Sequence, residues 1–166
     1  MLIAERKIFT PTYHFFEDDD YFGTLRASFF IPKAVFIARE GNYKFYREKL
    51  FEGKYFCDFH YDCKAIAEKP QGIGYSYSIK HKSISYLLKP GSLFNEMAAF
   101  QFELYEGNEL LGSIYENPTK FILSIEMERE VSRILQCFIF WLGFRAWIGL
   151  RGWRYVTGDT RAAMRS

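Results

Sequence analysis

The stretch from Val131 to Ile148, VSRILQCFIFWLGFRAWI, constrains the fold more than any other part of the chain. From Ile134 to Phe144 only Gln136 is polar, so bulky side chains would point in nearly every direction around a helix. A helix that is apolar on all sides lies either inside a protein or in a membrane. The placement of this one segment therefore decides the fold class.

The length of the apolar run favours a buried helix over a membrane span. A spanning helix needs about 20 mainly apolar residues, whereas runs of about 10–14 residues more often form core helices. Here Arg133 and Arg145 bound the uninterrupted run, and an arginine inside a span costs about 2.5–3.5 kcal/mol. We therefore predict a core helix over residues 131–148 and no transmembrane span. A membrane anchor and a partner-binding helix are the alternatives.

The residues around the run are typical of helix ends. Glu126, Glu128 and Glu130 precede it, where negative charge complements the positive end of the helix dipole. Gly149 follows it in the position of a C′ residue, which predicts that the helix ends at Ile148. Gly143 lies inside the helix at a cost of about 1 kcal/mol relative to alanine, which suggests that the helix backbone closely approaches another group there. A slight kink in the helix is the alternative.

Length and composition indicate one domain rich in β structure. The chain has 166 residues, and we predict a single domain over residues 1–150 with a basic tail over residues 151–166. The 18 Phe and 12 Tyr favour pleated strands. The 22 Lys and Arg nearly balance the 20 Asp and Glu, so no nucleic-acid partner is expected.

The cysteines and the N-terminus predict a cytoplasmic protein. Three cysteines cannot form a self-contained set of disulfides. If Cys57 and Cys63 lie on one extended strand, about 20 Å separates them, which is too far for a bridge. We therefore expect all three thiols to be reduced, as is usual in the cytoplasm. The first residues, MLIAERKIFTP, have no apolar run before their first charges, so we expect no export signal.

The chain before the helix alternates between apolar and polar residues in roughly ten to twelve short runs. We predict strands at Tyr21–Ile31 and at Tyr55–Cys63, and treat Tyr75–Leu88 as continuous strand pattern. In the run from Tyr55, Asp58 and His60 would share one face with Asp62. Gly and Asn residues mark turns between the runs.

A unit of strand, Glu-Gly-Asn turn and strand occurs twice. Glu40-Gly41-Asn42 with Lys54-Tyr55 is repeated, 66 residues later, as Glu106-Gly107-Asn108 with Lys120-Phe121. Repeated units of this kind build many closed β folds, although turn residues also match by chance. A helix of residues 132–148 would be about 26 Å long, close to the length of a strand of seven or eight residues. We therefore predict a mainly β fold, a closed antiparallel barrel of about twelve strands around one central hydrophobic C-terminal helix.

The sequence resembles the tubby-like group of β-barrels, in particular the LURP-one-related proteins. The paired Glu-Gly-Asn turns, the strand Leu110–Ile114, the two Lys-aromatic strand starts and the apolar helix carry the resemblance, which covers residues 2–148. It implies a twelve-stranded barrel around a hydrophobic helix. Some tubby-like relatives bind phosphoinositide headgroups, and phospholipid scramblases have been grouped with them. No lipid-binding motif of those relatives matches residues here, and fold transfers better than activity.

Catalytic and metal-binding patterns are weak. Asp58, His60 and Asp62 on one strand face would lie about 7 Å apart, wider than a single-ion site needs, so an exposed polar face is the simpler interpretation. On that strand His60 would point away from Cys57 and Cys63, which argues against zinc or a Cys–His pair. There is no Gly-x-Ser-x-Gly, Walker or His-Glu-x-x-His motif. We expect no enzyme activity, no metal and no cofactor.

Two basic groups are candidate contacts for an anionic lipid surface. Lys80 and Lys82 would share a strand face, and the tail carries arginines beside tryptophan, which suits a membrane surface. Ordinary solvated charge is the alternative. The candidate contacts in the tail are Arg151, Trp153 and Arg154.

The acidic turn gives a second functional hypothesis. The residues Glu17, Asp18, Asp19 and Asp20 lack the pattern of an EF-hand calcium loop, so a solvated turn is expected. They are also candidate contacts for a partner protein. We predict a non-catalytic binding or scaffold protein, cytoplasmic and peripheral to membranes if it binds lipid. An immunity-type inhibitor that blocks a toxin by direct binding is the alternative, followed by an enzyme or a carrier of hydrophobic ligands.

Overall fold

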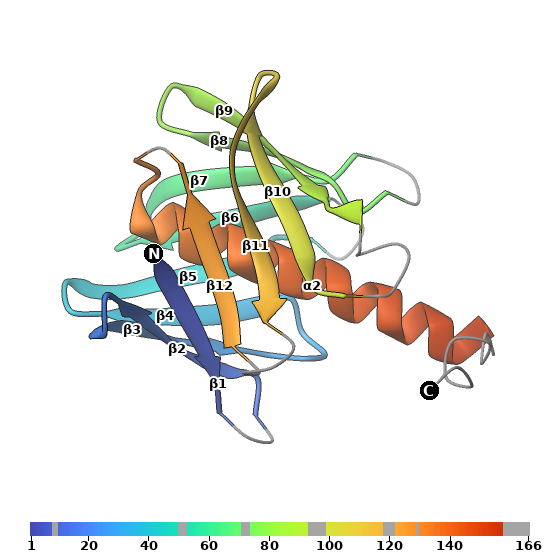
Figure 1. The fold of residues 1–166 in the computed structure, drawn as a ribbon, viewed down its shortest axis with the longest axis horizontal. Helices are drawn as coiled ribbons and strands as arrows, with labels where there is room; N and C mark the ends of the chain where they lie inside the picture. Colours follow the sequence, from blue (N-terminus) through green and yellow to red (C-terminus); the bar gives the residue numbers. More distant parts are fainter. Residues whose placement is uncertain are drawn as a thin grey trace.

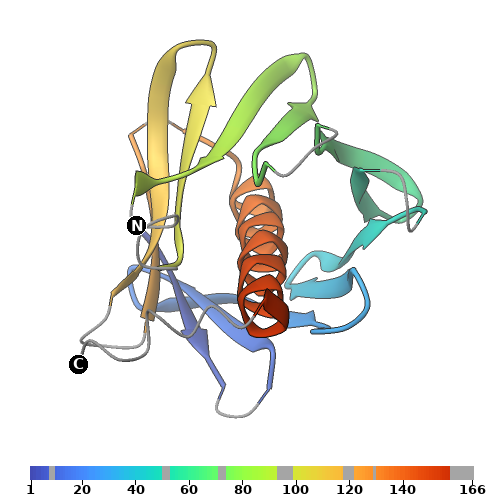
Figure 2. The ribbon, with the colours of Figure 1, turned by 90° about the vertical axis from the view of Figure 1, so that its right-hand side faces the viewer.

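The computed structural model describes residues 1–7, 10–49, 53–70, 74–92, 99–117, 122–128 and 130–157. Within these residues, twelve strands form a closed antiparallel barrel around one long helix, α2 (Arg133–Thr157) (Figures 1 and 2). The predicted fold class is confirmed. The strands are β1 (Leu2–Arg6), β2 (Thr12–Glu17), β3 (Asp20–Ala27), β4 (Lys33–Ala38), β5 (Gly41–Arg47), β6 (Lys54–Phe59), β7 (Asp62–Glu68), β8 (Tyr77–His81), β9 (Ile84–Pro90), β10 (Gln101–Glu106), β11 (Glu109–Asn117) and β12 (Ile122–Met127).

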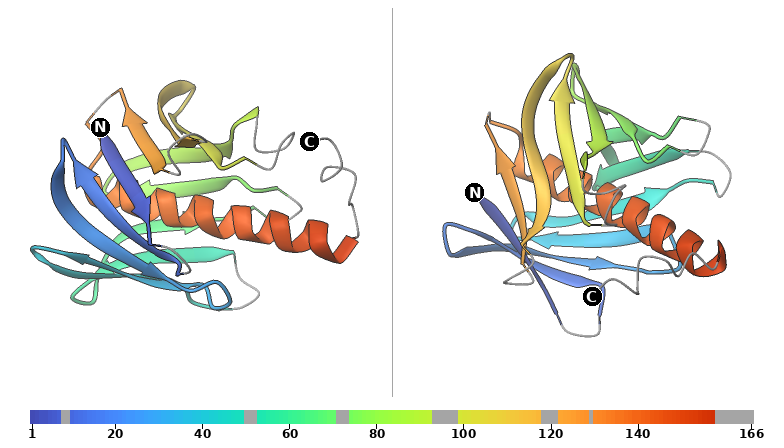
Figure 3. Two further views of the ribbon diagram at one scale, coloured as in Figure 1. Left: turned by 60° about the horizontal axis from the view of Figure 1, so that its bottom comes forward. Right: turned by 45° about the vertical axis from the view of Figure 1, so that its right-hand side comes forward.

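The order of the strands gives the barrel two different ends. Each strand pairs with its neighbours in the chain, and β1 closes the ring on β12 through pairs such as Leu2 with Ile125. The β2–β3, β4–β5, β6–β7, β8–β9 and β10–β11 turns all lie at one end, which we call the turn end. The remaining connections lie at the opposite, loop end. Because α2 follows β12, it enters at the turn end, and its last turns extend beyond the loop end (Figures 1 and 3).

Aromatic side chains fill the space between the barrel wall and α2. Phe45 of β5 lies edge-on to Phe138 with ring centroids 5.3 Å apart, and Tyr55 of β6 lies 5.9 Å from Trp141. Phe138 and Trp141 are fully buried. Burying a side chain of this size stabilises the fold by about 1.5–3 kcal/mol, so the all-apolar character of the helix is explained by contacts on every side.

Gly143 marks a close approach between the helix and the barrel wall. A Cβ atom at this position would lie 3.0 Å from Cδ2 of Phe102 and 3.3 Å from Cζ of Phe100. The predicted close approach at Gly143 is therefore confirmed, and the groups that approach are the rings of Phe102 in β10 and of Phe100 just before it.

The helix begins and ends later than predicted. It starts at Arg133 because the Ser132 hydroxyl accepts a hydrogen bond from the backbone N–H of Leu135 at 3.3 Å, as an N-cap does. The predicted end at Ile148 is wrong, since the helix continues through Gly149 to Thr157. Gly149 has no positive φ, and nothing lies within 4 Å of the position of its missing Cβ. The helix therefore crosses the predicted boundary between domain and tail.

Two runs predicted as continuous strand are hairpins. The run from Tyr55 to Cys63 turns at His60 and Tyr61, whose φ angles are 48° and 66°. Left-handed conformations are uncommon at residues other than glycine, although histidine adopts them more often than most, so the sequence carries only a weak signal for this turn. Cys63 consequently pairs with Asp58 across β6 and β7. The distance argument against a Cys57–Cys63 bridge is therefore wrong, although both thiols are free.

The second such run, Tyr75–Leu88, divides into β8 and β9 at a turn that contains Lys82, with φ 55°. The predicted strand Tyr21–Ile31 also ends early, at Ala27. Its last apolar residues belong to the β3–β4 connection instead.

The repeated unit corresponds to strands six places apart in the barrel, β4–β6 and β10–β12. Matching positions are buried in both copies: Phe36 with Phe102 and Cys57 with Leu123. The turns do not match, because the first lies at residues 39–40 and the second at residues 107–108. The repeat is therefore preserved in strand order and burial but not in hairpin register. Lys120-Phe121 lies outside the described residues.

Candidate functional site

Charged side chains divide unequally between the two ends of the barrel. We compare the two strand residues nearest each end, the adjoining connections and the nearby helix residues, within the described part of the chain. The loop end has ten basic residues (Arg6, Lys7, Arg26, Lys33, Arg47, Lys49, Lys54, Lys69, Lys89 and Arg145) against four acidic ones (Glu5, Glu48, Glu68 and Glu116). The turn end has twelve acidic residues (Glu17, Asp18, Asp19, Asp20, Glu40, Asp58, Asp62, Glu106, Glu109, Glu126, Glu128 and Glu130) against four basic ones (Arg39, Lys80, Lys82 and Arg133). The net charge of +2 for the whole chain hides this separation.

The predicted acidic contacts form the β2–β3 hairpin at the turn end. Asp18 and Asp19 occupy the left-handed turn, with φ angles of 49° and 70°. Glu17 forms an ion pair with Arg133 at the start of α2, and Asp18 lies 3.8 Å from the N-terminal ammonium. Part of this acidic group therefore contacts the N-terminus of the chain and the start of the helix, while Asp19 and Asp20 remain exposed.

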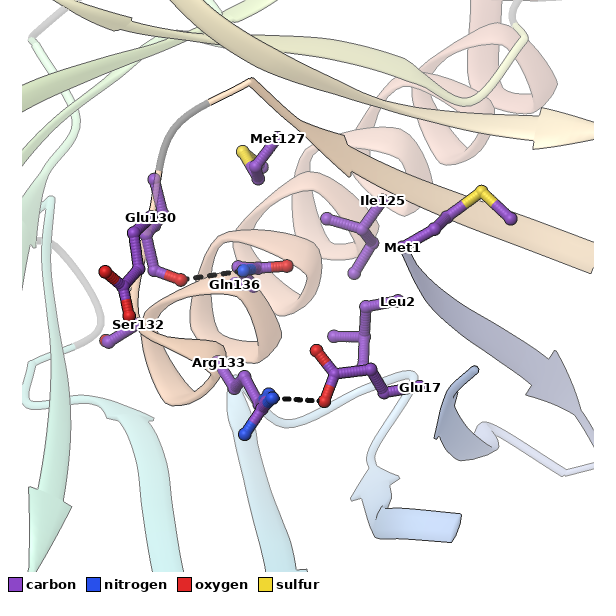
Figure 4. A pocket seen from close by; sticks show the side chains of 10 residues that line it. Met1, Leu2, Glu17, Ile125, Met127, Glu130, Ser132, Arg133 and Gln136 are labelled. Carbon is purple, nitrogen blue, oxygen red and sulfur yellow. Dashed lines mark hydrogen bonds and ion pairs between the residues drawn. The ribbon is translucent and has the colours of Figure 1, made fainter. Parts of the chain in front are cut away.

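A pocket of about 380 Å³ opens beside the first turn of α2. Figure 4 shows Glu17 and Arg133 facing one another across its lower side, with Gln136 on the helix above them. The Gln136 side-chain amide donates to the Val131 carbonyl oxygen at 2.7 Å. Glu17, Arg133 and Gln136 thus each contact another residue that lines this pocket.

The two predicted basic groups lie at opposite ends of the molecule. Lys80 is exposed on the outside of β8, whereas Lys82 lies in the following turn, so the predicted common strand face is wrong. Both lie at the acidic turn end. Arg151, Trp153 and Arg154 fall in the last part of α2, beyond the loop end. The structure therefore does not combine these groups into one site.

A groove on the outer face of β3–β5 contains cations that the sequence did not single out. It measures about 390 Å³, and Arg26, Lys33 and Lys44 line it together with Val35 and Tyr46. Register explains the grouping, since Arg26 pairs with Val35 and Val35 pairs with Lys44 across the three strands. None of the described residues that line the groove is a carboxylate. Three separate outward-facing cations become one site only when the strand register is known.

The β3–β4 connection beside this groove exposes two apolar side chains. Phe30 is 92% exposed and Ile31 is 56% exposed. The loop itself is held in place, because Arg145 of α2 donates from Nη1 to the carbonyl oxygens of Ser28 and Phe29 at 3.1 and 2.9 Å. The loop end therefore has a basic rim and an exposed apolar tip, next to a groove lined by three cations.

The thiols are poorly placed for nucleophilic chemistry. Burial raises the pKa of Cys57 and raises the pKa of Cys137 well above its ordinary value, so both remain protonated at neutral pH. Burial, followed by the charge of Asp58, also raises the pKa of Cys63. Among the residues that the structure describes, no three His, Cys, Asp or Glu side chains come together as metal ligands.

One helical segment is long and apolar enough to cross a membrane by length and composition, namely Arg133–Leu150. Of this segment, 56% is buried inside the protein, and it is the segment that the strands surround. The core helix of a soluble protein meets the same criteria.

No family model, no curated protein and no solved structure matches the chain.

Proposed function

We propose that this protein is a non-catalytic module that binds anionic phospholipid surfaces through the loop end of its barrel. The observation that carries the proposal is the groove of Arg26, Lys33 and Lys44, which lies on the outer face of β3–β5 next to the basic loop end and has no carboxylate among its described lining residues. Clustered cations near an anionic bilayer each contribute about 1 kcal/mol of attraction. The resemblance to tubby-like proteins, which stays a prediction, favours the same class of ligand.

The expected site in the cell is the cytoplasmic face of a membrane, where anionic lipids are concentrated. Three free cysteines are compatible with a reducing compartment. Trp153 and the arginines Arg151 and Arg154 on the extension of α2 would lie at the same end as the groove, and tryptophan with arginine suits the headgroup region.

The test is flotation of the intact protein with vesicles of phosphatidylcholine alone or with added phosphatidylserine. We expect binding only to the anionic vesicles and weaker binding at 1 M salt, where the screening length falls to about 3 Å. The double variant Arg26→Glu/Lys33→Glu should bind about thirtyfold more weakly or worse, since two contributions of about 1 kcal/mol are lost.

A matched control changes the same amount of charge at the other end. Lys80→Glu/Lys82→Glu replaces two exposed cations at the turn end and should leave vesicle affinity within about threefold of the wild type, because screened charges on the far side contribute little. Equal losses of vesicle affinity in the two variants would argue against the groove as the binding site. Failure of the wild-type protein to bind anionic vesicles would refute the proposed lipid-binding function.

A second candidate function, an immunity-type inhibitor that acts through the acidic turn, is favoured by the exposure of Asp19, Asp20 and Tyr61 at the turn end. Capture of one tight protein partner that is lost when both aspartates are replaced by asparagine would favour this candidate instead.

A further inference from the structure

The apolar tip of the β3–β4 loop is not explained by charge attraction alone. Phe30 is 92% exposed and Ile31 is 56% exposed, side by side in sequence at the loop end. Single exposed apolar residues are common on soluble proteins. Two adjacent large ones at the tip of a connection form an apolar projection with no protein cover among the described residues.

The rest of the loop is fixed, so the tip does not simply collapse onto the barrel. Arg145 holds the carbonyl groups of Ser28 and Phe29, and the Phe29 ring lies 6.0 Å from that of Phe144. The backbone N–H of Ile31 donates to the Ser28 hydroxyl at 3.1 Å. A tip held in one conformation loses little entropy when it binds, which favours association.

Cations surround the base of this tip. Lys33 follows the loop directly, and Arg26 precedes it on β3; both line the groove described above. Apolar side chains flanked by Lys and Arg are typical of segments that lie at a membrane interface, where the cations meet the headgroups and the apolar groups enter the acyl boundary. This continuity with the basic end favours a bilayer over an apolar pocket of another protein.

We propose that the loop from Ser28 to Pro32 is a membrane wedge, in which Phe30 and Ile31 enter the acyl boundary while Arg145 anchors the loop to the core helix. This inference rests on the proposed lipid-binding function and adds to it the depth and orientation of binding. The wedge would place the loop end against the bilayer, with the axis of α2 directed toward the membrane.

The experiment attaches an environment-sensitive fluorophore to position 30. Cys57 and Cys137 are 1% and 0% exposed, so a Cys63→Ser background leaves Phe30→Cys as the accessible thiol among the described residues. With phosphatidylserine-containing vesicles we expect a blue shift and quenching by nitroxides in the acyl chains. The control carries the fluorophore at Tyr61→Cys, which is 97% exposed at the turn end and should show neither change.

A second measurement uses unlabelled protein. The variant Phe30→Ser/Ile31→Ser should bind anionic vesicles at least tenfold more weakly while keeping its salt dependence, whereas Tyr61→Ser should bind like the wild type. A cooperative thermal unfolding transition, measured for each variant, checks that the variant is folded.

The outcomes separate the two proposals. Salt-sensitive vesicle binding with an unchanged fluorophore at position 30 and full affinity of Phe30→Ser/Ile31→Ser would overturn the wedge and leave the lipid-binding function intact. No binding of the wild type to anionic vesicles would overturn both. Equal blue shifts at positions 30 and 61 would overturn the orientation and thus the wedge.

Discussion

Tyr13 shows how one residue couples the barrel to its helix. It lies at the loop end of β2 with its ring edge-on to Phe140 and Phe144, at centroid distances of 4.9 and 5.5 Å. Only 2% of its surface is exposed. Burial, opposed in part by the charge of Arg6, raises the pKa of Tyr13 from 10.0 to about 12. Ionising this phenol would place a negative charge against the apolar helix, so the folded state keeps the phenol proton to a higher pH than the unfolded state does.

The raised pKa predicts loss of stability in alkali. Because the folded pKa of Tyr13 exceeds the unfolded value, its contribution is complete below pH 10 and is lost as pH rises toward about 12. In that window Tyr13 should lower the free energy of unfolding by about 1.4 kcal/mol per pH unit. Denaturant unfolding of wild type and Tyr13→Phe at pH 8 to 11 measures the difference between them.

The phenylalanine variant separates the effect of Tyr13 from that of the other buried tyrosines. Tyr77 is one of them, and burial raises its pKa as well. We expect the two proteins to diverge above pH 10, with Tyr13→Phe the more stable. Parallel stability curves up to pH 11 would contradict the assignment.

At the scale of one element, α2 has two different environments. From Leu135 to Ala146 most of its side chains are buried, and Gly143 lies against β10. Beyond Gly149 the helix extends past the loop end of the barrel (Figure 3). Isolated helical turns are only marginally stable in water. The extension is therefore helical because it continues the buried part of α2, and Gly149, which joins the two parts, lowers the stability of the extension.

Gly149→Ala distinguishes the observed helix from the one predicted by sequence. In a helix that continues to Thr157, alanine should stabilise the extension by about 0.8–1 kcal/mol, since nothing lies within 4 Å of the new methyl group. If Gly149 instead ended the helix in a left-handed conformation, alanine would destabilise it by about 1–2 kcal/mol. Far-ultraviolet circular dichroism and hydrogen exchange of residues 150–157 give the sign.

For the whole molecule, the separation of charge follows the direction of α2. The acidic turn end surrounds the positive end of the helix dipole, an arrangement that stabilises the helix. The negative end lies at Thr157, beyond the basic loop end. Structural support therefore accounts for part of the acidic charge at the turn end. It does not account for the exposure of Phe30 or for the collection of Arg26 and Lys33 in one groove.

Removing residues 151–166 tests whether the extension of α2 contributes to the stability of the barrel or to the proposed lipid-binding surface. The described core ends before this segment, so a chain that ends at Leu150 should unfold within a few degrees of the full chain. If Arg151, Trp153 and Arg154 contact lipid, the same truncation should weaken binding to anionic vesicles by at least tenfold, at about 1 kcal/mol for each arginine. Calorimetry and flotation measure the two effects separately. Unchanged flotation would show that these three residues do not belong to the lipid-binding surface.

The sequence by itself determined the main architecture. An apolar run of core-helix length and alternating segments of similar length together predict a closed barrel around a helix, because both patterns are local and report which faces avoid water. The close approach at Gly143 was predicted on a different ground, because a glycine inside a helix costs stability. The turn at His60 and Tyr61 was not predicted, since it contains no glycine and the alternation of side chains continues through it.

Only the tertiary structure decided what the surface presents. The closure of Leu2 on Ile125, the anchoring of Ser28 by Arg145 and the row from Arg26 through Val35 to Lys44 join residues by pairing rather than by proximity in the chain. Strand register and the sorting of connections to two ends are set by the combined packing of the closed sheet, and a one-residue slip would rearrange every outward face. The groove and the apolar tip exist only once that packing is complete.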